Sequence, residues 1–170
     1  TETEPLPQYK TVTKAGLSPH MAKIRLLQIC DGKNAIVFDM KFLAPEMFLT
    51  FLQTKRFIAH NALFDLQFLM QWGAKNVNIG CTYLLAKLLY HAIYPTDAGL
   101  SASLQALVAT VFQTEMVKKM QLSDFTVPDL TFEQVEYAAL DSISVLKLAE
   151  KMAPGLQKYG TKYSLISLIH

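Results

Sequence analysis

Four polar residues occur in two stretches at spacings that suit metal-dependent chemistry. The stretch FIAHNALFDLQFL places Asn61 at an expected helix N-cap and Asp65 one turn into that helix. The stretch EYAALDSISVL places Tyr137 and Asp141 four residues apart, on one face of a second expected helix. A carboxylate in the apolar surroundings of Asp65 is desolvated at a cost of several kcal/mol unless it is paired or bound to a metal. These residues are therefore candidates for a cation site.

Each candidate also has a purely structural explanation. An acidic residue such as Asp65 is favoured near the start of a helix by the helix dipole. Asn61 could act only as the N-cap, or as both cap and ligand. His60 ends an expected strand, and we interpret it as structural. Tyr-x-x-x-Asp alone is a weak signal, so the argument depends on the order of the two stretches.

The pattern His-Asn-x-x-Phe-Asp, followed later by Tyr-x-x-x-Asp, resembles the second and third motifs of the DEDD 3′–5′ exonucleases, tyrosine subgroup. That superfamily includes ribonuclease D and the proofreading domains of family A DNA polymerases. The segment KKMQLSDF also resembles the family's lead-in to its third motif. The resemblance covers nearly the whole chain. It implies an α/β, ribonuclease H-like exonuclease fold with a mixed central sheet and helices packed on it.

The resemblance also implies roles for individual residues. The family uses Asp-x-Glu in the first motif and one Asp in each of the next two to bind two Mg²⁺ or Mn²⁺ ions. Two such ions, roughly 4 Å apart, supply a hydroxide and neutralise charge on the phosphate and the leaving oxygen. By this resemblance Asp65 and Asp141 bind metal, Tyr137 orients the attacking water, and Asn61 contacts the terminal nucleotide.

The first motif departs from the family pattern, and two alignments are open. One places Thr11-Val12-Thr13 at the Asp-x-Glu positions, which leaves a fold without its first two ligands. The other takes TETE as the tail of Asp-Thr-Glu-Thr, so that Glu2 is the second ligand and the Asp precedes Thr1. We favour the second, because AGLSPH resembles the phrase that follows a long loop in bacterial polymerase-like proteins. The first strand is then truncated, and the chain as it stands is expected to be nearly inactive.

The elements that must position these residues follow from apolar periodicity and turn residues. We expect a β-hairpin with strands at 24–30 and 35–40. Thr131 and Gln134 form an expected capping box for a helix from Phe132 to about Met152. Its inward apolar stripe is expected to comprise Phe132, Val135, Ala139, Leu146 and Ala149. The remaining expected elements are helices at 45–53, 62–72, 82–90 and 103–112, strands at 57–60 and 77–81, loops at 95–103 and 121–130, and a last helix after Pro154.

Composition narrows the class of protein. An apolar content of 51% excludes disorder, and 170 residues are enough for one domain with a full core. No apolar run approaches the roughly 18 to 20 residues of a membrane span, and the polar N-terminus is not a signal peptide. Cys30 and Cys81 are interpreted as reduced thiols of a cytoplasmic protein. A net charge of +2 without a basic block indicates no wide duplex-binding surface, whereas a short single-stranded end could still bind.

The sequence therefore predicts a single exonuclease domain over residues 1–170. Its closing segment, KYGTKYSLISLIH, resembles the linker to a polymerase domain. We therefore expect this linker to be truncated in the sequence. The favoured function is metal-dependent removal of nucleoside monophosphates from the 3′ end of single-stranded DNA. The alternatives are a degenerate exonuclease fold that only binds nucleic acid or a partner, and an RNA-trimming enzyme of the ribonuclease D kind. The sequence alone does not separate DNA from RNA, because no reader of the 2′-hydroxyl can be recognised.

Overall fold

The computed structural model describes residues 1–93, 99, 101–114 and 123–163. Contacts between Cα atoms divide the chain into two compact units. The first comprises Thr1–Arg56, Leu63–Asn78 and Val117–Ile143, and the second comprises Phe57–Ala62, Ile79–Met116 and Ser144–His170.

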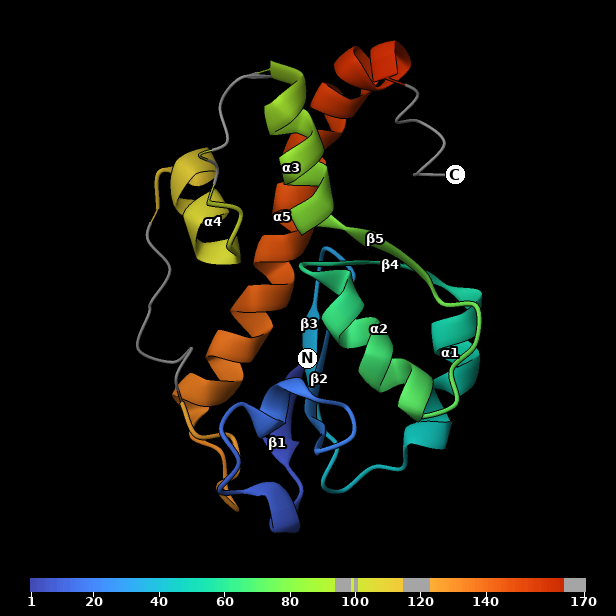
Figure 1. The fold of residues 1–170 in the computed structure, drawn as a ribbon, viewed down its shortest axis with the longest axis vertical. Coiled ribbons are helices and arrows are strands. Elements are labelled where there is room, and N and C mark those ends of the chain that lie inside the picture. Colours follow the sequence, from blue (N-terminus) through green and yellow to red (C-terminus); the bar gives the residue numbers. More distant parts are fainter. Residues whose placement is uncertain (94–98, 100, 115–122, 164–170) are drawn as a thin grey trace. The chain divides into compact units, whose positions relative to one another are not determined.

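A three-stranded antiparallel sheet organises the first unit (Figure 1). Its strands are β1 (Glu2–Pro5), β2 (Ala22–Cys30) and β3 (Ala35–Asp39), in the order β1-β2-β3. The hairpin between β2 and β3 is the one expected, and its register pairs Cys30 with Ala35. Asp31 closes the turn, because its carboxylate accepts the backbone N–H groups of Lys33 and Asn34 at 2.8 and 2.7 Å.

The helices of the first unit begin close to the expected residues. A 3-10 turn, η3 (Pro45–Phe48), leads into α1 (Leu49–Thr54), and most of α2 (Ala62–Gln71) follows. Phe48 links this part of the core, because its ring contacts Phe38 of β3 at 5.0 Å and Trp72 at 6.3 Å between centroids. Two further 3-10 turns, η1 (Pro7–Tyr9) and η2 (Ala15–Leu17), connect β1 to β2.

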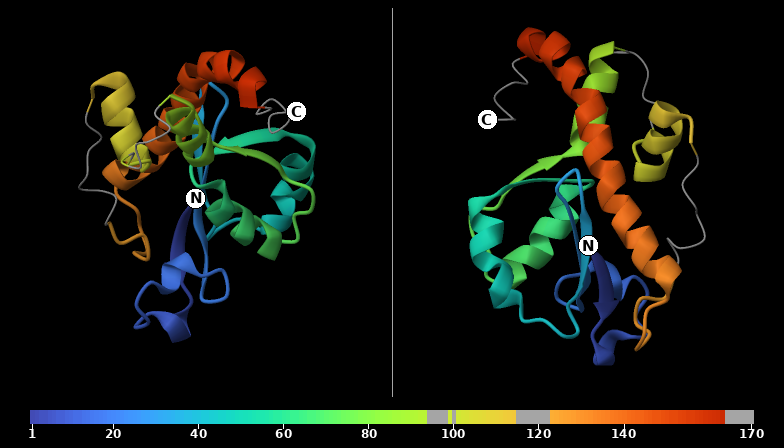
Figure 2. Two further views of the ribbon diagram at one scale, coloured as in Figure 1. Left: turned by 45° about the horizontal axis from the view of Figure 1, so that its top comes forward. Right: turned by 180° about the vertical axis from the view of Figure 1, so that it is seen from behind.

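The longest helix, α5 (Phe132–Tyr163), begins at the expected capping box. The side chain of Gln134 accepts the N–H of Thr131 at 2.9 Å, and Thr131 Oγ1 accepts the N–H of Gln134 at 3.3 Å. The expected break near Met152 is wrong, because α5 continues through Pro154 as one unbroken helix (Figure 2). Leu148, Met152 and Leu156 pack on one core cluster, and this packing outweighs the hydrogen bond that proline removes.

The expected inward stripe of α5 is also wrong in its first turns. Phe132 is 76% exposed and Val135 is 37% exposed. The buried residues are instead Gln134, Tyr137 and Ala138. Polar side chains occupy the buried face because each has a local partner there, which removes the cost of burying it.

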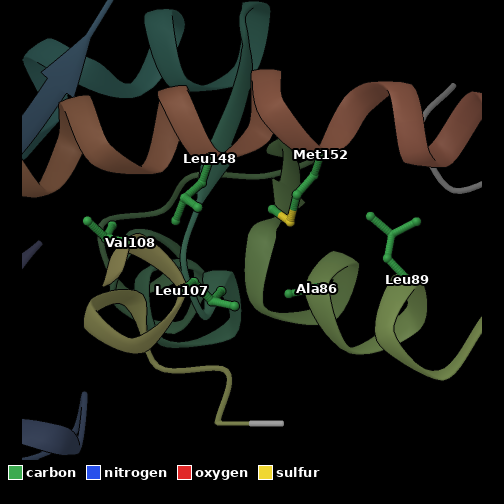
Figure 3. Close-up of a cluster of buried hydrophobic side chains, with 6 residues drawn as sticks. All are labelled: Ala86, Leu89, Leu107, Val108, Leu148 and Met152. Carbon is green, nitrogen blue, oxygen red and sulfur yellow. The ribbon is translucent and has the colours of Figure 1, made fainter. Parts of the chain in front are cut away.

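In the second unit, helices surround one apolar cluster. A two-stranded sheet of β4 (Arg56–Ala59) and β5 (Asn78–Cys81) precedes α3 (Thr82–Ile93), and α4 (Leu104–Phe112) follows. Ser103 caps α4, since its side chain accepts the N–H of Ala106 at 3.3 Å. Figure 3 shows side chains of α5 pointing toward those of α3 and α4; the cluster comprises Ala86, Leu89, Leu107, Val108, Leu148 and Met152.

Some sequence predictions fall on residues that the structure does not describe. These are most of the loop at 95–103, the first five residues of KKMQLSDF (118–122), and the chain after Tyr163. Among the helices of the described part, none is both long enough and apolar enough to cross a bilayer.

Candidate active site

Four of the five candidate residues lie in the first unit, on three different elements. Glu2 is on β1, Asp65 is in the first turn of α2, and Tyr137 and Asp141 are on α5. The start of β1 reaches α2, as the position of the N-terminus in Figure 1 shows. Segments far apart in the sequence therefore bring three carboxylates and one phenol into the same unit.

Asp65 is paired with a cationic group. The α-ammonium and the hydroxyl of Thr1 both donate to Asp65 Oδ1, each at 2.9 Å. Burial alone would lower the pKa of this amine, but the charge of Asp65 and its hydrogen bond outweigh burial, so the pKa is raised. Glu2 and Asp141 raise it further. The ammonium thus occupies a place where negative potential attracts a cation.

Glu2 is a carboxyl group that holds its proton unusually tightly. Burial raises its pKa to about 7, and the α-ammonium of Thr1 opposes that rise. The carboxylates of Asp141 and Asp65 raise the pKa further, while a hydrogen bond from Gln28 lowers it. Glu2 therefore interacts electrostatically with both Asp65 and Asp141 in poorly hydrated surroundings.

The carboxyl group of Asp141 also has a pKa that burial raises. Burial raises its pKa to about 6, opposed by a hydrogen bond from the Tyr137 hydroxyl and by the α-ammonium. Its Oδ1 atom is buried and has no hydrogen-bond partner among the described residues. Tyr137 is itself buried, in a cluster with Leu26, Phe125 and Ala138. This cluster fixes the ring, and the hydroxyl is directed at the carboxylate.

The chemistry of these groups fits a hard divalent cation. Carboxylate oxygens are the ligands that Mg²⁺ prefers, and a bound cation reverses the repulsion that raises carboxyl pKa values. The buried Asp141 Oδ1 atom, which accepts no hydrogen bond from the described residues, is also available to coordinate a cation. Within the described part of the chain, however, no three His, Cys, Asp or Glu side chains converge closely enough to hold an ion as they stand. Asp65 is instead neutralised by Thr1.

Asn61 is the candidate that falls outside the first unit. It directly precedes α2, is exposed, and adopts a left-handed φ of 56°, which asparagine tolerates better than most residues. His60 lies beside it in the second unit, where its Nδ1 is 3.0 Å from Thr82 Oγ1 and its ring meets Tyr83 edge-on.

The two alignments of the first motif lead to different places. Thr11, Val12 and Thr13 are exposed and lie in the bends between η1 and η2. Glu2 lies on a strand and interacts with Asp65 and Asp141. The two alignments therefore place their candidate residues in different surroundings, exposed bends for one and a strand beside two further carboxyl groups for the other.

Sequence reasoning missed a second charged centre in the first unit. Arg25 of β2 is only 1% exposed and pairs with Asp39 of β3 at 2.9 Å and with Glu4 of β1 at 3.7 Å. Its guanidinium also donates to the carbonyl oxygens of Val127 and Pro128 at 3.2 and 3.4 Å. The available signal was an arginine inside the largely apolar run IRLLQIC, where a charged side chain is rare without partners.

Comparisons with known proteins agree with this geometry. A family model described as 3′–5′ exonuclease matches residues 14–157, a range that contains Asp65, Tyr137 and Asp141 but not Glu2. DNA polymerase I of Aquifex aeolicus (strain VF5) is 29% identical over 131 residues, which are 76% of this chain and 21% of that protein. The chain thus spans about a fifth of the length of this curated relative.

Solved structures show the same fold. Brucella melitensis NrnC bound to pGG superposes with a TM-score of 0.71 at 25% identity, covering 98% of this chain and 77% of that chain. NrnC with bound Mg²⁺ gives 0.68 at 24% identity over the same shares. The Aedes aegypti Nibbler EXO domain gives 0.70 at 17% identity, over 88% of this chain and 79% of its own. These likenesses confirm the ribonuclease H-like exonuclease fold expected from the sequence.

Proposed function

The chain belongs to the 3′–5′ exonuclease family, and on that premise we propose that it removes nucleotides from the 3′ ends of single-stranded DNA. The observation that carries the proposal is the electrostatic interaction of Glu2 with both Asp65 and Asp141, together with the hydrogen bond from Tyr137 to Asp141. Hydrolysis would release nucleoside monophosphates, as in proofreading.

Each residue has a role in this proposal. Glu2, Asp65 and Asp141 would hold two Mg²⁺ or Mn²⁺ ions, as the family does. When bound, such ions lower the pKa of a water and neutralise charge on the phosphate. The Tyr137 hydroxyl, directed by its bond to Asp141, orients the attacking water, which is the role that defines the tyrosine subgroup. Asn61 contacts the terminal nucleotide.

Support for DNA as the substrate comes from the likeness to a DNA polymerase I, in which a polymerase domain would be the natural partner of this one. NrnC, which is similar in fold and was solved with pGG, supports a short nucleic-acid end rather than a duplex. The net charge of +2 is consistent with that preference, because wide phosphate contact needs a larger basic surface.

A second candidate is an exonuclease fold that binds nucleic acid or a partner without cutting. The observation in its favour is that no three His, Cys, Asp or Glu side chains converge on a metal-binding position among the described residues. This alternative differs from the first only in turnover, so one assay separates them.

The assay uses 5′-labelled single-stranded DNA and RNA of one sequence, with Mg²⁺ or Mn²⁺, and reads the products on a sequencing gel. We expect a ladder of products shortened from the 3′ end, formed faster from DNA, and lost in Asp65→Asn and Asp141→Asn. Glu136→Gln, an exposed carboxylate of α5, is the matched control and retains activity.

Three outcomes decide between the candidates. A DNA ladder that depends on Asp65 and Asp141 supports the proposal. Degradation of RNA alone supports the ribonuclease D kind of enzyme. Binding of the strand without shortening in either metal supports the non-cutting fold.

A further inference from the structure

The segment that precedes α5, Ser123–Leu130, lies against the buried tyrosine. Phe125 of this lead-in segment is 6% exposed and packs in the same cluster as Tyr137, and Leu130 packs against that cluster. The lead-in segment therefore helps to fix where the phenol of Tyr137 is held.

Gln134 ties the lead-in segment to α5. Its side-chain amide donates to Ser123 Oγ at 2.6 Å and to the carbonyl oxygen of Asp124 at 2.9 Å. Because the same side chain completes the capping box, the segment and the first turn of α5 behave as one piece. A second contact is needed to hold the lead-in segment and the first turn of α5 against the sheet.

Arg25 makes that second connection. Its guanidinium reaches the carbonyl oxygens of Val127 and Pro128 in the lead-in segment, and its charge is balanced by Asp39 and Glu4 on the two flanking strands. One side chain thus joins all three strands to the segment, which runs beside the sheet in Figures 1 and 2. Glu4 is also two residues from Glu2 on β1.

We propose that Arg25 is a positioning residue of the exonuclease site, holding Tyr137 and Asp141 on α5 in register with Glu2 on β1. The inference rests on the proposed function for its effect on turnover, and on contacts alone for its effect on geometry. A buried ion-pair network often contributes less stability than apolar packing of equal volume. The contribution of the network around Arg25 is therefore to fix the positions of the segments that it joins. Arginine is required because its planar, forked guanidinium can serve several acceptors at once, whereas a lysine ammonium is a point charge.

Three variants separate this role from a general loss of stability. Arg25→Lys keeps the positive charge between Asp39 and Glu4 but removes the fork. Arg25→Met keeps the bulk and removes the charge. Lys41→Met is the matched control, because Lys41 Nζ donates to the same Pro128 carbonyl at 3.1 Å from an exposed position.

The readouts are chosen to separate geometry from catalysis. Amide exchange over residues 123–131 reports the hold on the lead-in segment, and the chemical shift of ¹³C-labelled Tyr137 reports the environment of the phenol without any need for activity. In Arg25→Lys we expect exchange in the segment to rise at least tenfold while β2 and β3 stay protected. The Tyr137 signal should shift. kcat should fall about 10- to 100-fold with KM nearly unchanged, as expected when a catalytic group is misplaced. Lys41→Met should change none of these.

The outcomes are distinguishable. Unchanged exchange and an unchanged Tyr137 signal in Arg25→Lys overturn the inference, whatever the activity. A shifted signal with wild-type kcat also overturns it, because the contact would then not govern turnover. If the wild-type protein does not shorten the strand, the proposed function fails, and exchange together with the Tyr137 signal still decides whether Arg25 positions α5. Should Arg25→Met fail to fold, Arg25→Lys carries the test by itself.

Discussion

Replacing Asp141 with Asn should stabilise the metal-free protein at pH 8 while abolishing 3′-end degradation. The pKa of Asp141 is raised from 3.8 to about 6, chiefly by burial. Between those two values the folded protein holds a proton that the unfolded chain has released, so stability falls as pH rises through this window. Above pH 6 the full penalty applies, and below about pH 4 it is absent. Asn carries no charge at any pH, so the penalty disappears.

The magnitude follows from the same shift. A rise of about two pKa units corresponds to about 3 kcal/mol at a pH above both values. The Asn amide adds donor groups to a buried position, at a cost of about 1 kcal/mol if they stay unpaired. The net gain is about 2 kcal/mol, and for a chain of this size each kcal/mol moves Tm by about 2–4 °C. We therefore expect Tm at pH 8 in EDTA to rise by about 4–8 °C.

Thermal melts at pH 4 and pH 8 in EDTA measure this effect. At pH 4 the variant should melt about 2–4 °C below the wild type, because the Asp141 carboxyl is then largely neutral and only the cost of the unpaired amide is left. Glu136→Gln on the same helix is the control, since an exposed substitution changes stability by less than about 0.5 kcal/mol. A fall in Tm for Asp141→Asn of equal size at both pH values would refute the reasoning, because the carboxylate would then be a net stabilising contact.

Three further predictions follow from the described contacts. Tyr137→Phe should lower kcat far more than the affinity for a single strand, measured with Ca²⁺ in place of Mg²⁺, because the hydroxyl acts on the attacking water; equal losses in both would contradict this role. Mn²⁺ should raise the Tm of the wild type at pH 8 and much less at pH 5, because protonated Glu2 and Asp141 are poor ligands; an equal rise at both pH values would exclude these carboxyls as ligands. Pro154→Ala should stabilise the protein by about 1–3 kcal/mol, read as an increase in Tm, because the new N–H can complete a helical hydrogen bond; a destabilised variant would mean that α5 ends before residue 154.

Sequence reasoning located elements well where a local signal was decisive. The hairpin at 24–40 was predictable because β-rich runs flank a turn whose aspartate caps its own backbone. The capping box of Thr131 and Gln134 was predictable for the same reason, since both partners lie within one helical turn. Such signals depend on residues close in sequence, which is why they need no knowledge of the tertiary fold.

The buried face of α5 could not be predicted in the same way. Apolar residues occur on nearly every side of that helix, so periodicity does not choose between the stripe with Phe132 and Val135 and the one with Tyr137 and Ala138. The choice depends on distant partners: Phe125 packs on Tyr137, and the amide of Gln134 bonds to Ser123. Arg25 was missed for a related reason, because a buried charge is acceptable only when its partners on other strands are known.

The two charged centres of the first unit differ in net charge, and this difference separates their roles. Around Arg25, the cations Arg25 and Lys23 face the anions Glu4 and Asp39, so the charges cancel and the contacts can fix geometry. Around Asp65, three carboxyl groups face a single α-ammonium, so two negative charges stay uncompensated when all are ionised. With pKa values raised to about 7 and about 6, Glu2 and Asp141 make up this deficit by taking up protons as the pH falls below those values. A divalent cation would make it up without protons, and binding it should therefore release protons from Glu2 and Asp141.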